Sequence, residues 1–273
     1  MRPSPNMGPL MTPWIRNLVM ANVAVFLITA YTTVGPMLAS MMALRPSLGW
    51  ILRQPWTPIT YMFVHANFMH IFFNMLVLFF FGPRLEMKLG GAKFLRLYFI
   101  SGLTGALLSL AFALGPVVAI VGASGAVYGV LMAFAVLWPR DAIYIWGIVP
   151  IQARWLVGVM TAMTVFFGFG GAQDGVAHFA HLGGFLGGYL YMRHLERNSP
   201  HRKFKELSHA ADRRRPGQDS QDMHRWANIR AESLHEVNRD EVERLQAKIR
   251  DLGVASLTLD ERAFLNRFSA LRN

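Results

Sequence analysis

A serine lies among small residues in the stretch GASGAVYG, residues 122–129, and its hydroxyl is polar in a strongly apolar part of the chain. Histidines occur before and after it, at His70 and at His178 and His181. An imidazole that accepts the proton of a serine hydroxyl turns that oxygen into a nucleophile for carbonyl carbon. Residue types and order therefore point to Ser124 as a nucleophile with a histidine as general base.

Attack on a carbonyl also needs donors for the oxygen that becomes negative. His70 and Asn74 are four residues apart, which places both on one face of a helix. Gly122 permits a tight turn before the helix that Ser124 would open, and it leaves the first amides of that helix free to point at an anion. We expect His70, Asn74 and these amides to form an oxyanion hole.

The glycines favour one histidine as the base. Gly125 and Gly129 repeat at an interval of four after Ser124, as Gly184 and Gly188 do after His181, and such spacing permits close contact between two helices. His181 shares its helical stripe with Gly184 and Gly188. His178 lies on the same general face and is the alternative, but the residues at the same offsets from it are His181 and Phe185, so the close-packed stripe fits His181 better. We expect His181 to be the base.

A third catalytic group is not evident. The nearest acidic residue in this layer is Asp174, before the last apolar segment, so the sequence predicts a Ser–His dyad rather than a triad. Tyr128, one turn after Ser124, is the aromatic residue that we expect to orient His181.

Long apolar segments must position these groups. Hydrophobic residues make up 53% of the 273 positions, and a helix needs about 20 mostly apolar residues to cross the hydrocarbon core. The chain has such segments, and we expect six spanning helices within residues 14–195, with 1–13 as an N-terminal segment. The segments centre on 17–34, 69–82, 95–114, 124–138, 155–171 and 176–192.

Basic residues mark one side of the predicted bundle. Residues 1–197 hold 12 Lys/Arg and 4 Asp/Glu, and most of these cations flank alternate connections. The positive-inside rule then puts both termini in the cytoplasm. Ser124, His70, Asn74 and the two histidines fall at one depth near the opposite surface, where polar groups face one another or water rather than lipid. Because the cations follow the ends of the spans, the net charge of +11 does not indicate nucleic-acid binding.

Two further regions have distinct compositions. The connection 35–66 contains Trp50, Trp56 and Tyr61, which we expect to hold it at the membrane interface. Residues 196–232 are expected to be a polar linker, and residues 233–273 a soluble helical hairpin. The first helix of that hairpin is predicted to have one apolar side, formed by Val237, Val242, Leu245 and Ile249. The second helix is predicted to begin with a capping box of Thr258 and Glu261.

These motifs resemble those of the rhomboid family of intramembrane serine proteases. HANFMHIFFN, GASGAVYG and AHFAHLGGFLGG match HxxxN, GxSG and AHxxGxxxG in the family's order, over roughly residues 10–195. The resemblance implies a six-helix bundle that hydrolyses peptide bonds in or near transmembrane helices of substrates, without a metal or cofactor. It implies a multi-pass protein of a bacterial inner membrane. Glu86 takes the place of a glutamate in the family's loop after the second helix. Some members have an adjacent Trp-Arg pair in the first loop, whereas here Trp50 and Arg53 are near each other in the sequence but not adjacent.

By the resemblance, Ser124 is the nucleophile, His181 the base, and His70 and Asn74 the oxyanion donors. Gly122, Gly125, Tyr128, Gly184 and Gly188 support them. The expected partners are the lipid bilayer and substrate helices, with a cytoplasmic partner for the terminal hairpin.

Three other interpretations compete with that of an active intramembrane protease. The polar groups can be interhelical hydrogen bonds in an inactive rhomboid-like protein that binds transmembrane clients. His65, His70, His178 and His181 can gather around a metal, although the HExxH spacing is missing. A transporter is the third, although the chain shows no internal repeat.

Overall fold

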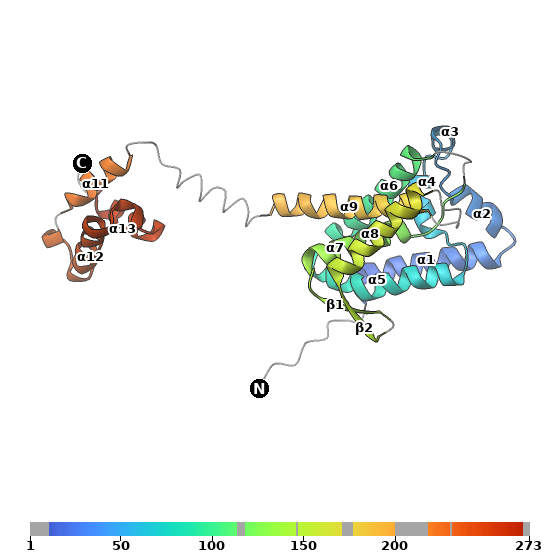
Figure 1. Ribbon diagram of the computed structural model, residues 1–273, viewed down its shortest axis with the longest axis horizontal. Helices are drawn as coiled ribbons and strands as arrows, with labels where there is room; N and C mark the ends of the chain where they lie inside the picture. Colours follow the sequence, from blue (N-terminus) through green and yellow to red (C-terminus); the bar gives the residue numbers. More distant parts are fainter. Residues whose placement is uncertain are drawn as a thin grey trace. The chain divides into compact units, whose positions relative to one another are not determined.

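The computed structural model describes residues 11–113, 118–145, 147–170, 177–199, 218–229 and 231–269. The chain divides into two compact units, Met1–Asn198 and Ser199–Asn273, and each is described by itself. The first unit is a helical bundle that contains every residue of the predicted site (Figure 1). Its long helices are α1 (Pro13–Tyr31), α5 (Phe68–Leu89), α6 (Gly91–Ala111), α7 (Ser124–Leu137), α8 (Ala153–Phe169) and α9 (His178–Arg197).

The lengths of these helices bear on how many cross a membrane. Three of them, α1, α5 and α6, are long and apolar enough to cross by length and composition. The apolar helices α7 and α8 have 14 and 17 residues, and α9 has 20 residues but ends in charged ones. The chain is therefore a helical polytopic membrane protein, as the sequence predicts, while the number of six spans stays a prediction.

Helix α7 lies inside the bundle. Nine of its 14 positions are buried, whereas only three of the 17 positions in α8 are buried. Helices α6 and α9 pack against α7 and against each other (Figure 1). The small residues that the sequence places along α7 and α9 permit this close packing.

One end of the bundle is fixed by polar contacts between helices. The buried carboxylate of Glu86, near the end of α5, accepts hydrogen bonds from the backbone N–H groups of Trp14 at 3.2 Å and Ile15 at 3.1 Å, and from the Thr12 hydroxyl. These N–H groups belong to the first turn of α1 and have no partner within that helix. Glu86 therefore caps α1 from inside α5, and the expectation that it lies in a loop was wrong.

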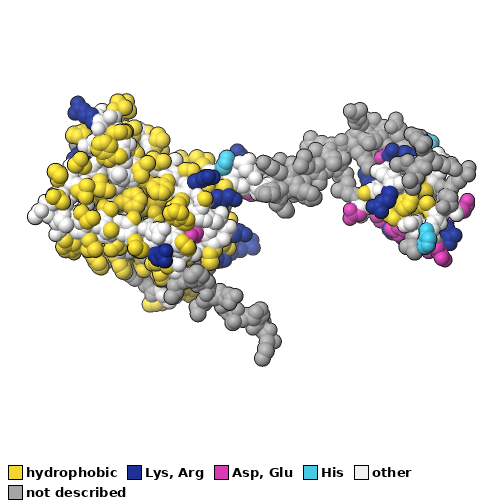
Figure 2. Space-filling view, turned by 180° about the vertical axis from the view of Figure 1, so that it is seen from behind, with side chains coloured by type: hydrophobic (Ala, Val, Ile, Leu, Met, Phe, Trp, Pro, Cys, Tyr) yellow, Lys and Arg dark blue, Asp and Glu magenta, His cyan; other side chains and the backbone are white. Residues whose placement is uncertain are grey.

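A second contact at this end joins α5 to the end of α7. Arg84 forms an ion pair with Asp141, and its guanidinium lies 4.0 Å from the ring centre of Trp138. Since α5 and α7 both end here, their first turns, with His70 and Ser124, lie toward the other end of the bundle. Figure 2 shows an apolar surface over this unit, with Lys and Arg gathered toward the end from which α9 leaves.

The connection between α1 and α5 is helical rather than irregular. It contains α2 (Gly35–Met42), α3 (Leu48–Arg53), α4 (Thr57–Thr60) and the short 3-10 helix η1 (Tyr61–Phe63). Trp50 and Trp56 are 40% and 45% exposed, in keeping with an interfacial position. Tyr61 is fully buried, and its hydroxyl donates to the Gly102 carbonyl at 2.8 Å, so it is not the interfacial anchor that we expected.

Two short strands follow α7. Strands β1 (Ala142–Ile145) and β2 (Val149–Gln152) pair antiparallel, with Ala142 opposite Gln152 and Ile145 opposite Val149. Gly147 takes a φ of 73° in the turn between them, which a residue without a side chain adopts most easily. This hairpin is a small addition to a helical fold.

Within its described residues the second unit contains the helices α11 (Gln218–Ala227), α12 (Glu236–Leu252) and α13 (Leu259–Ser269), with 3-10 turns η2 (Ala231–Ser233) and η3 (Val254–Ser256). The predicted apolar side of α12 is buried at Val242, Leu245 and Ile249, while the Val237 side chain lies outside the described residues. The predicted capping box is confirmed. Thr258 N–H donates to the Glu261 carboxylate at 2.7 Å, and Glu261 N–H donates to the Thr258 hydroxyl at 3.2 Å.

Part of the expected linker is helical. Helix α11 falls within residues 196–232, and Trp226 is fully buried in the same apolar cluster as Val242 and Leu245. Its indole N–H donates to Asn266 of α13 at 3.0 Å. A single buried tryptophan contributes a large apolar area, so α11 adds to the core of this unit although most of its other residues are polar. The expectation of a linker throughout 196–232 and of a two-helix hairpin was wrong here.

Candidate active site

Ser124 and His181 lie within hydrogen-bonding distance. The His181 Nε2 atom is 2.7 Å from the Ser124 Oγ atom, although the two residues are 57 positions apart in the chain. Ser124 is the first residue of α7, and His181 lies in the first turn of α9. Both side chains are half-buried, so a substrate can reach them. The contact is the geometry that proton transfer from the hydroxyl to the imidazole requires.

Tyr128 holds the plane of the imidazole. Its ring stacks on the His181 ring with centroids 4.2 Å apart and an angle of 14° between the planes. The ring of Phe185, one turn after His181, lies 4.7 Å from the Tyr128 ring. A stacked aromatic neighbour restricts rotation of the imidazole and keeps Nε2 directed at Ser124.

The backbone before Ser124 is fixed by the connection between α1 and α5. Gly122 has a φ of 120°, which a residue with a side chain rarely adopts, and its N–H donates to the Tyr61 carbonyl at 2.9 Å. Two residues earlier, Ile120 and Leu44 exchange backbone hydrogen bonds of 2.7 and 3.0 Å. These bonds fix the chain up to Gly122. The first backbone N–H groups of α7, which begins at Ser124, follow directly and are not used by these bonds.

His70 and Asn74 lie on α5 as their spacing predicts, but their contacts differ. The His70 ring packs against Gly122, because a methyl group on that glycine would lie 2.5 Å from His70 Nε2. The Asn74 amide is buried and donates to the His70 carbonyl at 2.8 Å. His70 is thus brought to the turn before Ser124, while Asn74 contacts its own helix.

Sequence reasoning missed His65 and Tyr61 as parts of this site. The backbone N–H of Ala123 donates to His65 Nε2 at 3.4 Å, and the His65 and His70 rings are 5.0 Å apart. The sequence predicts His65 only as a ligand of the alternative metal site and Tyr61 only as an interfacial residue. Their partners are backbone groups far along the chain, and residue spacing carries no signal for such contacts.

His178 lies on a different side of α9. Its ring stacks against Phe167 of α8, with centroids 5.7 Å apart. Of the two candidate bases, the structure therefore brings His181 rather than His178 to Ser124. Asp174 lies outside the described residues. Within the described ranges, no three His, Cys, Asp or Glu side chains lie together where they could hold a metal ion.

The glycines of α7 and α9 allow the two helices to approach closely enough for Ser124 to contact His181. A methyl group on Gly184 would overlap the Gly125 carbonyl oxygen, and one on Gly188 would lie 2.6 Å from the Gly129 carbonyl oxygen. Backbones this close leave no room for a side chain at these positions. The small residues therefore set the distance between the helix that carries Ser124 and the helix that carries His181.

Known proteins share this part of the chain. The Rhomboid domain family model matches residues 52–197, which include every residue of the predicted site. RHOMBOID-like protein 4 of Arabidopsis thaliana is 32% identical over 65% of this chain and 51% of its own length. Rhomboid protein 1, mitochondrial, of Saccharomyces cerevisiae is 35% identical over 47% of this chain and 38% of its own length. The putative rhomboid protease YdcA of Bacillus subtilis is 32% identical over 50% of this chain and 64% of its own length.

The match covers more than half of the chain, and the chain therefore belongs to the rhomboid family. The chain matches about half or less of the length of RHOMBOID-like protein 4 and of two further Arabidopsis thaliana relatives, RHOMBOID-like proteins 7 and 1. At the level of the family this membership supports an intramembrane protease, although the family also includes inactive members.

Proposed function

We propose that this protein is an intramembrane serine endopeptidase that cleaves peptide bonds in or next to the transmembrane helices of other membrane proteins. Ser124 is the nucleophile and His181 the general base. The observation that carries the proposal is the 2.7 Å distance between Ser124 Oγ and His181 Nε2, on two helices whose close approach the glycines permit.

Acylation follows from this contact. His181 Nε2 accepts the hydroxyl proton while Ser124 Oγ adds to the carbonyl carbon of the scissile bond. The protonated imidazole then gives its proton to the leaving amine, and the carbon–nitrogen bond breaks to leave an ester on Ser124. Water, deprotonated by the same imidazole, hydrolyses the ester. Tyr128 stacks on the ring during both steps and keeps Nε2 on the line to Oγ.

The negative charge of the tetrahedral intermediate needs donors beside Ser124. The first amides of α7 have no partner within the helix, and the helix dipole favours an anion at this end. His70 lies against Gly122 and brings a side-chain donor to this turn. Asn74 donates to the His70 carbonyl, and its proposed role as a donor requires that its amide turns toward the substrate.

The substrate must present an extended backbone to this site. A carbonyl inside a helix is already hydrogen-bonded and is covered by the surrounding side chains. Substrate helices should therefore be cut where small or helix-breaking residues expose the backbone. Replacing those residues by leucine should protect the same bond from cleavage.

The test is cleavage of a small panel of single-span membrane proteins by the purified full-length chain in lipid vesicles, with Ser124→Ala as the control. Cleavage by the native chain and none by Ser124→Ala is the expected result. Binding of the same substrates without cleavage would contradict the proposal and support an inactive rhomboid-like protein that handles transmembrane clients. Cleavage that survives Ser124→Ala would also contradict it.

A further inference from the structure

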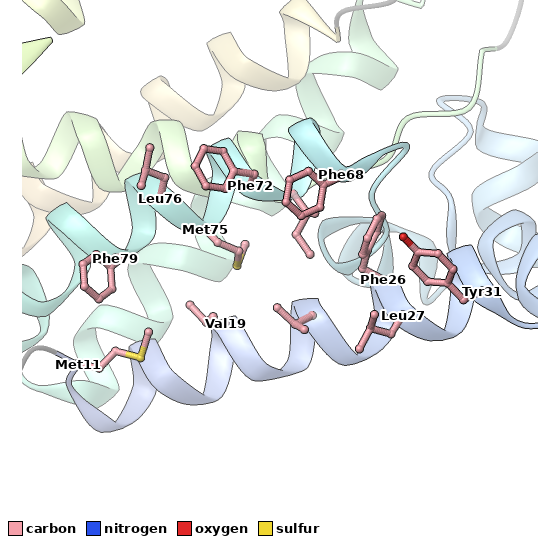
Figure 3. A pocket seen from close by; sticks show the side chains of 12 residues that line it. Met11, Val19, Phe26, Leu27, Tyr31, Phe68, Phe72, Met75, Leu76 and Phe79 are labelled. Carbon is pink, nitrogen blue, oxygen red and sulfur yellow. The ribbon is translucent and has the colours of Figure 1, made fainter. Parts of the chain in front are cut away.

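An apolar groove runs along α1 and α5, apart from the contact between Ser124 and His181 (Figure 3). Its volume is about 460 Å³, and it is bounded by aliphatic and aromatic side chains of both helices. On α1 these include Val19, Val23 and Leu27, and on α5 they include Phe68 and Phe72. Figure 3 shows the two rows of side chains facing each other across the groove.

The groove is open to the surroundings of the bundle. Val23 and Leu27 are 39% and 52% exposed, and Phe68 and Phe72 are 63% and 43% exposed. Both helices are long and apolar enough to cross a membrane, so these surroundings are lipid. The groove therefore meets hydrocarbon chains along its length.

A charged residue of α1 lies beside this groove, although its side chain is not one of those that line it. Arg16 precedes Val19, Val23 and Leu27 by 3, 7 and 11 positions, and helical periodicity puts residues at these offsets on one face. Its side chain is exposed, and within the described residues it forms no ion pair. Trp14, 41% exposed in the same turn, is typical of the membrane–water interface.

The dimensions fit a lipid. Eleven residues of helix separate Arg16 from Leu27, which is about 16 Å and roughly half of the hydrocarbon thickness. A guanidinium at the interface donates two parallel hydrogen bonds to a phosphate. We propose that the groove between α1 and α5 binds an acyl chain of an anionic phospholipid whose phosphate group is held by Arg16.

A transmembrane helix of another protein fits less well. A helix with its side chains is about 10 Å or more across, so a length of about 16 Å occupies roughly 1,300 Å³. The groove offers about 460 Å³, a third of that volume. Its size thus favours a hydrocarbon chain over a peptide helix, and Arg16 favours an anionic headgroup.

The carboxylate near this end does not repel the lipid strongly. Glu86 is buried, and its oxygens already accept hydrogen bonds from Thr12 and from the first amides of α1. The exposed cation Lys88, two residues later on α5, adds positive charge at the same end of the bundle. The balance at the mouth of the groove is therefore favourable for a phosphate.

The experiment is native mass spectrometry of the full-length chain, released from detergent after incubation with dioleoyl phosphatidylglycerol, dioleoyl phosphatidylcholine or inorganic phosphate. Phosphatidylglycerol should be retained in preference to phosphatidylcholine. Arg16→Gln should weaken its retention about tenfold, as expected for loss of a charge-assisted contact. Val23→Trp, which fills the groove, should have a similar effect.

Two matched variants serve as controls. Arg140→Gln removes an exposed cation outside the groove, and Val159→Trp adds an indole to an exposed position of α8. Neither should change phosphatidylglycerol retention. If Val23→Trp fails to fold, Val23→Phe gives the same comparison with a smaller side chain, and Arg16→Gln decides the role of the headgroup by itself.

Three results would overturn the proposal. Equal retention of both lipids would show that only the surrounding bilayer fills the groove. An unchanged retention in Arg16→Gln would remove the phosphate contact. Full displacement of phosphatidylglycerol by inorganic phosphate would indicate a site for a soluble anion.

Discussion

Gly184 faces the backbone of Gly125 so closely that a methyl group on it would overlap the Gly125 carbonyl oxygen. This contact holds α9 against α7 directly after Ser124 and one turn after His181. Gly184→Ala should therefore destabilise the protein by about 1–3 kcal/mol, and it should lower cleavage by moving the imidazole from the hydroxyl. Thermal unfolding of the full chain in detergent and a cleavage assay measure the two effects.

The control for this substitution is Gly158→Ala on α8, where nothing lies within 4 Å of the added methyl group. It should leave stability unchanged or raise it by up to about 1 kcal/mol, because alanine favours a helix over glycine. A Gly184→Ala protein as stable and active as Gly158→Ala would contradict the account of helix packing.

The stack of Tyr128 on His181 leads to a second prediction. Tyr128→Phe keeps the ring and should retain most of the activity, whereas Tyr128→Ala should lower kcat by about 10- to 100-fold because the imidazole is no longer held in place. Tyr189→Ala, which removes an exposed aromatic ring elsewhere on α9, is the control. If Tyr128→Ala and Tyr189→Ala had the same kcat, the stack would have no positioning role.

The cap on α1 gives a third prediction. Glu86→Ala leaves the first amides of α1 and the Thr12 hydroxyl without their buried acceptor, which should cost about 1–3 kcal/mol of stability. Glu196→Ala removes an exposed carboxylate on α9 and should cost less than about 0.5 kcal/mol. Chemical or thermal unfolding in detergent compares the two, and equal losses would count against the cap.

The second unit should respond to acid through Glu261. Hydrogen bonds from Lys248, then from Thr258 N–H and Arg244, lower the pKa of this carboxyl to about 2. A carboxyl with a lowered pKa in the folded state stabilises the fold at neutral pH, and this contribution is lost as the pH falls from about 4.5 toward 2. Amide hydrogen exchange of α12 and α13 in the full-length protein, corrected for intrinsic rates, should quicken over this range.

Glu261→Gln is the control for this effect, because it cannot titrate. Its exchange at neutral pH should already be faster than that of the native chain, and its pH dependence between 5 and 2 should be weaker. Identical pH profiles for the two proteins would contradict the role of Glu261.

Local patterns in the sequence predicted much of this structure. Apolar segments and the glycine interval indicated the helices and the approach of His181 to Ser124, because both signals are periodic along one chain segment. The capping box of Thr258 and Glu261 was also recognisable, because both residues lie within four positions of each other.

The contacts that escaped prediction join distant segments. The burial of Trp226 depends on α12 and α13, and the polar residues around it indicate a linker when they are considered alone. Glu86, Tyr61 and His65 contact backbone groups 41 to 72 positions away, and a backbone N–H or carbonyl has the same chemistry at every position. Such partners are fixed by tertiary packing, which spacing along the sequence does not encode.

The central claim is that Ser124 is a nucleophile activated by His181. The most direct measurement is labelling of the full-length protein in lipid by a serine-directed fluorophosphonate, with the modified residue located by peptide mass spectrometry. We predict a single phosphonylated serine at 124, with labelling lost in His181→Ala and retained in His178→Ala. Labelling of another residue, or labelling of Ser124 at the native rate in His181→Ala, would contradict the account.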